Sequence, residues 1–92
     1  MYRGRFDVLL GGEKVSKIEE ILRERWHAKE IVVSKFKDGW RITFLTEDRK
    51  KIFTLFGIIE RYGGEVVEYR INKVDPLPEV LDAKVINTKG GD

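Results

Sequence analysis

The side chains that most often carry catalysis are scarce in this sequence of 92 residues. It holds no Cys and a single His, His27, so thiol catalysis, disulfides and a closed zinc site are excluded. Its few hydroxyl side chains have no base at a spacing that would activate them. The paired carboxylates Glu19-Glu20 and Glu47-Asp48 are adjacent on predicted helices and therefore point apart. We expect no catalytic, cofactor-binding or metal-binding residue, and hence no enzyme.

Basic side chains are a second candidate for chemistry, because Lys and Arg bind phosphate. The formal net charge is only +2, but the basic excess lies in the first half of the chain. The candidate phosphate-binding residues belong to the predicted hairpin and to the start of the second predicted helix: Lys35, Lys37, Arg41, Arg49, Lys50 and Lys51. The alternative is that these side chains form ion pairs with acidic neighbours on a solvated surface.

A glycine pair marks a third candidate, at the turn between the first predicted strand and the first predicted helix. Backbone amides of Gly11 and Gly12, together with Lys14, could hold an anion at the helix N-terminus. The segment lacks the spacing of a Walker loop or a dinucleotide fingerprint. With the order of elements described below, it resembles the small-molecule regulatory domains of the ACT type. That resemblance implies a small-ligand sensor, and a tight turn without a ligand is the alternative.

Hydrophobic spacing predicts the elements that position these residues. Strands are predicted over residues 6–10, 30–36, 40–45 and 65–71, and helices over 13–27 and 47–62. Thr46 is the predicted N-cap of the second helix, and Gly63 follows its end. The order β-α-β-β-α-β predicts a ferredoxin-like α+β fold, with a four-stranded antiparallel sheet and both helices on one face. We assign residues 1–75 to this domain, and residues 76–92 to an extension with a short strand over 83–86 and a mobile Gly-rich tail.

The dipeptide Asp38-Gly39 predicts the tight turn of the central hairpin, because a primed turn needs positive φ and Gly39 provides it. Two registers stay open, one pairing Lys37 with Trp40 and the other pairing Phe36 with Trp40. Residues 38–45 resemble the strand signature of RNA-recognition domains in their Gly and the aromatic residue after it. Ile42, however, stands where that family stacks an aromatic ring on RNA.

Alternation along the strands assigns the two faces of the sheet. The side expected to face the helices carries Phe6, Val8, Leu10, Trp40, Ile42, Phe44, Val67, Tyr69 and Ile71. The open side is expected to carry Asp7, Leu9, Arg41, Thr43, Leu45, Val66, Glu68 and Arg70, with either Val32, Ser34 and Phe36 or Ile31, Val33 and Lys35. Because an exposed surface of mixed polarity suits a partner, the candidate interface is Leu9, Arg41, Thr43 and Leu45.

Together these patterns favour a small non-enzymatic binding or assembly module that forms a homodimer through its open sheet face or an edge strand. Binding of RNA or DNA through the basic first half is the alternative, and small-ligand sensing at the glycine turn is a second one.

Many charged residues, no Gln and one Met are typical of a thermophilic source. The N-terminal residues do not form a signal peptide, and no apolar run is long enough to span a bilayer. We therefore expect a cytoplasmic protein with no membrane partner.

Overall fold

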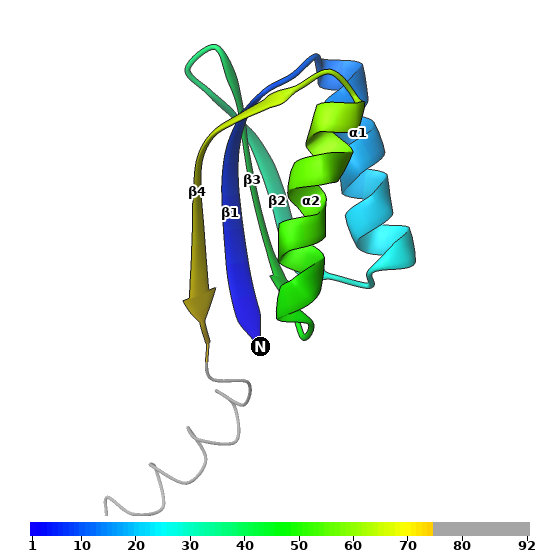
Figure 1. Cartoon of the computed structure of the whole chain (residues 1–92), viewed down its shortest axis with the longest axis vertical. Coiled ribbons are helices and arrows are strands. Elements are labelled where there is room, and N and C mark those ends of the chain that lie inside the picture. The colour runs from blue at the N-terminus through cyan, green and yellow to red at the C-terminus, as the bar shows by residue number, and fades with distance from the viewer. Residues whose placement is uncertain (75–92) are drawn as a thin grey trace, which may run out of the picture.

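Four strands and two helices form residues 1–74, the part of the chain that the computed structural model describes (Figure 1). In chain order they are β1 (Tyr2–Leu9), α1 (Gly12–Glu20), a π-helical turn η1 (Ile21–Arg25), β2 (Lys29–Phe36), β3 (Gly39–Thr46), α2 (Arg49–Arg61) and β4 (Glu65–Lys73). The strands form one antiparallel sheet in the order β2-β3-β1-β4, and both helices lie on one face of it. The predicted ferredoxin-like α+β fold is confirmed. The strand expected over 83–86 and the expected tail lie outside the described residues.

The core lies between the helices and one face of the sheet. The two central strands supply Phe6, Val8, Ile42 and Phe44, each at most 2% exposed. The ring of Phe44 lies over Gly4 on the neighbouring strand, where an added Cβ would come within 2.9 Å of the ring. The helices contribute six buried residues, Val15, Ile18, Leu22, Ile52, Leu55 and Ile59. Because burying one such side chain contributes roughly 1.5–3 kcal/mol, this core is the main source of stability.

The first helix changes its hydrogen-bond pattern halfway along. The backbone N–H of Trp26 donates to the Ile21 carbonyl at 3.1 Å, which is the i→i+5 bond of a π-helix. The helix predicted over 13–27 is therefore an α-helix followed by one π-helical turn. After this turn the Trp26 ring packs edge to face against Phe44, with the ring centroids 6.2 Å apart.

Local hydrogen bonds set both ends of α2. The Asp48 carboxylate accepts the Lys50 backbone N–H at 2.9 Å, so Asp48 is the N-cap and the prediction of Thr46 was wrong. The Thr46 hydroxyl instead accepts the backbone N–H of Asp48 at 3.3 Å, which orients the chain before the cap. At the other end Gly63 has φ +84°, and Gly63 and Gly64 donate to the carbonyls of the last turn at 2.9 Å each. This Schellman arrangement confirms the predicted glycine stop.

The β2–β3 hairpin has neither of the two registers that the sequence left open. Lys35 pairs with Trp40, and Phe36 pairs with Gly39, so the loop residues are Lys37 and Asp38. The positive φ falls on Lys37, at +55°, and Gly39 is needed for space, because a Cβ there would collide with the Val8 carbonyl oxygen. This register places Val32, Ser34 and Phe36 on the open face, one of the two sets that alternation allowed.

A β-bulge in β4 changes the faces at its first residues. The pairing with β1 shifts between Asp7 and Val8, so that Glu68 pairs with Asp7, Val66 pairs with Val8, and Val67 is the additional residue. Val66 packs against the core, whereas Val67 is 61% exposed. The prediction that Val67 faces the helices and Val66 the open side was therefore wrong, because strict alternation does not hold across a bulge.

We predict that Gly39→Ala destabilises the protein by about 1–3 kcal/mol, because the new methyl group must displace the Val8 carbonyl. Gly11→Ala is the matched control, since nothing lies within 4 Å of a Cβ there and the backbone is extended. Urea unfolding of the two variants beside the parent protein measures the difference. Equal stability of the two variants would contradict the close approach of β1 to the hairpin.

Candidate functional site

The centre of the open sheet face is an ion-pair network around Asp7 on β1. The Asp7 side chain is only 4% exposed and accepts two hydrogen bonds from the Arg41 guanidinium, at 2.8 and 3.1 Å. Arg5 lies 3.7 Å from the same carboxylate and donates to Glu68 at 3.2 Å. Three strands are thus joined by side chains of opposite charge across the open face.

Charge and stacking both fix Arg41 in this network. Its hydrogen bonds hold the pKa of the Asp7 carboxyl below the ordinary value, although burial acts in the opposite direction. The same hydrogen bonds raise the pKa of Arg41. The guanidinium also lies 3.9 Å from the centre of the Phe36 ring, a cation–π contact from β2. Arg41 is therefore occupied by neighbours in its own chain.

The four candidate interface residues do not form one exposed surface. Leu45 was expected to be exposed, but it is only 8% exposed. Leu45 pairs with Arg3 on one side and Lys29 on the other, and the ion pair of Arg3 with Glu30, at 3.1 Å, crosses from β1 to β2 over β3 at this position. Leu9 is 41% exposed, while Thr43 is half-buried. The expected exposure of Leu45 was therefore wrong. Alternation predicts which face of the sheet a residue occupies, but not whether neighbouring side chains cover it.

The six candidate phosphate-binding residues lie in separate places. Lys37 is at the hairpin loop, and Lys35 lies on the helix side of the sheet with its ammonium 4.9 Å from the Trp40 ring. The remaining three, Arg49, Lys50 and Lys51, begin α2 at the opposite end of the molecule from the hairpin loop (Figure 1). With Arg41 held by Asp7, the structure does not bring these side chains into one basic stripe.

The turn at Gly11 and Gly12 forms an ordinary helix start. Gly11 is the N-cap of α1, with φ −67° and ψ 150°, and its carbonyl accepts the backbone N–H groups of Lys14 and Val15 at 3.0 Å each. The Lys14 ammonium lies 5.6 Å from the centre of the Tyr62 ring at the end of α2. The Lys14 backbone N–H is thus used within the helix start itself, and its side chain lies against Tyr62.

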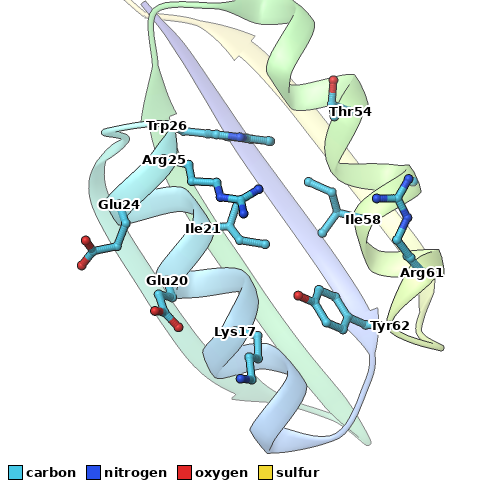
Figure 2. A pocket seen from close by; sticks show the side chains of 11 residues that line it. Lys17, Glu20, Ile21, Glu24, Arg25, Trp26, Thr54, Ile58, Arg61 and Tyr62 are labelled. Atoms are coloured by element: carbon cyan, nitrogen blue, oxygen red, sulfur yellow. The ribbon is translucent and has the colours of Figure 1, made fainter.

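A groove with a volume of about 720 Å³ lies between the two helices. Figure 2 shows Trp26 and Tyr62 at its two ends and Ile21 facing Ile58 across it. Gly57 lines the wall on α2, and nothing lies within 4 Å of the place where its Cβ would be. Of its charged lining residues, Glu20 and Glu24 point away from the groove in Figure 2, and residues 1–74 hold no group of three His, Cys, Asp or Glu that could bind a metal ion.

Exposed apolar side chains gather instead on the flank of the molecule formed by β4 and the adjoining side of α2. We call Phe53, Phe56, Val67, Tyr69 and Ile71 the β4 flank. Among residues 1–74, five large apolar side chains are exposed, and three of them, Phe53, Val67 and Tyr69, belong to this flank.

The sequence did not predict the β4 flank, because alternation along the strand places Tyr69 and Ile71 on the same face as the core residues. Their face was predicted correctly, but α2 leaves Tyr69 48% exposed. The Phe56 ring meets Tyr69 edge to face, with centroids 4.8 Å apart, and a hollow of about 360 Å³ continues from there to Val66 and Val67. The signal that could have found the flank is the position of β4 at the edge of the predicted topology, where one helix covers two strands.

No protein-family model matches this chain, and no curated protein matches it. Within residues 1–74, no helix is long and apolar enough to cross a membrane. The candidate site therefore has to be judged on its physical properties alone.

Replacing Asp7 tests the ion network on the open face. We predict that Asp7→Asn lowers stability at neutral pH by about 1–3 kcal/mol, the range for a hydrogen-bonded polar group that loses its charged partner. Because the pKa of Asp7 is lower in the folded protein than in the unfolded chain, the stabilisation is present at neutral pH and disappears as the pH falls below about 4. Urea unfolding at pH 7 and pH 3 measures both effects.

Glu19→Gln is the control for that experiment, since its carboxylate forms an exposed ion pair with Arg23 within one helix. We expect a much smaller change there. A difference between Asp7→Asn and the parent protein that stays the same at both pH values would contradict a charged Asp7 in the folded state.

The middle of α2 offers a test of the groove. We predict that Gly57→Ala stabilises the protein by about 0.5–1 kcal/mol, because glycine disfavours a helix interior and the added methyl group meets open space. Thermal and urea unfolding measure the gain. A loss of stability would show that something packs against Gly57 in solution.

Proposed function

We propose that this protein is a small non-enzymatic assembly module that acts as a homodimer through its β4 flank. The observation that carries the proposal is that exposed Val67 and Tyr69 lie together beside Phe56 at the edge strand, with exposed Phe53 one helical turn before Phe56 on α2. An apolar patch of this kind on a small domain favours burial against another protein surface. A second copy is the simplest partner, because most soluble oligomers are symmetric assemblies of one chain.

The charge distribution supports the flank over the centre of the open face. Desolvating Asp7, Arg5 and Arg41 would take an ion network out of water, and such a step costs free energy that the contacts formed often fail to return. The β4 flank instead presents valine, tyrosine and phenylalanine side chains, which gain from leaving water. We further propose that this dimer works in the cytoplasm of a thermophilic organism, where ion networks contribute more than they do at 25 °C.

Two exposed valines on opposite edges of the sheet provide a matched test. Val67 on β4 is 61% exposed and Val32 on β2 is 55% exposed, so a lysine at either position should leave the fold intact. We predict that the parent protein and Val32→Lys sediment as dimers, whereas Val67→Lys sediments as a monomer. Analytical ultracentrifugation at several protein concentrations measures this, with circular dichroism to verify folding.

A parent protein that stays monomeric over the concentration range would overturn the proposal. So would the reverse pattern, in which Val32→Lys dissociates and Val67→Lys remains a dimer, because the contact would then lie on β2.

A further inference from the structure

Resting on this proposed function, we infer that the two copies join by antiparallel pairing of their β4 strands about a two-fold axis that passes between the two Tyr69 residues. The sheet then continues from one copy into the other. This inference specifies a register, and the register follows from the order of charges along β4.

The backbone of β4 is available for such pairing in the part of the chain that the structure describes. Within residues 1–74, β4 pairs with β1 along one side only, from Tyr2 opposite Lys73 to Leu9 opposite Glu65. Alternate residues of an edge strand point their N–H and C=O groups away from the sheet. From Glu68 to Lys73 the strand is regular, since the bulge lies before Glu68.

β4 is complementary in charge to its own reversed copy. The strand reads Glu-Val-Val-Glu-Tyr-Arg-Ile-Asn-Lys from residue 65 to 73. With Tyr69 opposite Tyr69, Glu68 of each copy lies opposite Arg70 of the other. Beyond this pair the bulge before Glu68 changes the alternation, so the charge match rests on Glu68 and Arg70. Opposite charges that face each other across strands are favourable.

The neighbouring registers lose this match. A shift that centres the pair on Glu68 or on Arg70 places two like charges directly opposite each other, which is unfavourable. A shift by one residue places Tyr69 opposite Glu68 or Arg70. Because directly opposed residues share one face of a sheet, this shift would put the helices of the two copies on opposite faces. The segment expected as a fifth strand, residues 83–86, carries a single charge and so offers no counterpart to both Glu68 and Arg70.

The side chains near the axis are positioned to use this register. Tyr69 is held on the helix side of the sheet by the Phe56 ring, so both tyrosines lie on one face beside their α2 helices. The Glu68 side chain is 56% exposed, and only one of its oxygens is bonded to Arg5. Arg70 is exposed and makes no ion pair within residues 1–74, so it can pair with Glu68 of the second copy.

Charge reversal tests the register. We expect Arg70→Glu alone and Glu68→Arg alone to weaken the dimer by about tenfold or more, since each creates two like-charge pairs across the axis. An equimolar mixture of the two variants should form a heterodimer of near-parent affinity, because every Arg then faces a Glu. The double variant E68R/R70E should dimerise with itself again. Sedimentation gives the dissociation constants, and native mass spectrometry distinguishes heterodimer from homodimer by mass.

The control is Arg23→Glu, a charge reversal on η1 at a side chain that is 55% exposed, which should leave the dimer unchanged. If both single variants dimerise like the parent while Val67→Lys is monomeric, the β4 flank is the interface but the register is wrong. Failure of the mixture to recover affinity would also reject the register. A monomeric parent protein would overturn the proposed function together with this inference.

Discussion

The two-sided character of β1 is the constraint on which the rest of the structure depends. Its position in the sheet, between β3 and β4, means that each of its side chains has neighbours on both sides. One face of β1 carries Gly4, Phe6 and Val8 into the helix layer, and the other carries Arg5 and Asp7 into the open face. A one-residue slip would bury the charges and expose the core. The Asp7–Arg41 hydrogen bonds therefore select the same register as the hydrophobic core does.

That selection has a consequence for recognition. Because Asp7 pairs with both Arg41 and Arg5, a partner that docks on the centre of the open face would have to desolvate this ion network. Exposed apolar side chains gather instead on the β4 flank, beside a strand that only one helix partly covers. Tyr69 shows this, because it has the parity of a core residue and contacts Phe6 and Phe56, yet it remains 48% exposed.

The features that could be predicted from the sequence are those set by periodicity along single elements. The order of elements, the helix stripe of Ile52, Leu55 and Ile59, and the stop at Gly63 all follow from local spacing and φ preference. The features that could not be predicted depend on contact between elements. Gly39 occupies its position because the Val8 carbonyl approaches it, and Leu45 is buried because an ion pair crosses over it. The bulge could not be predicted either, because in the run Val66-Val67 either valine could be the residue that faces the core.

The opposite edge of the sheet explains why pairing through β4 would stop at two copies. An unprotected edge on both sides of a sheet allows open-ended growth, and proteins prevent this with bulges and lysines. β2 carries both devices: its pairing with β3 is interrupted between Lys29 and Val32, Glu30 has φ +50°, and Lys35 projects from the strand over Trp40. A two-fold contact between β4 strands uses the remaining edge of each copy completely. The difference between the two edges of this sheet, one protected and one complementary to itself, favours a closed dimer over a fibre.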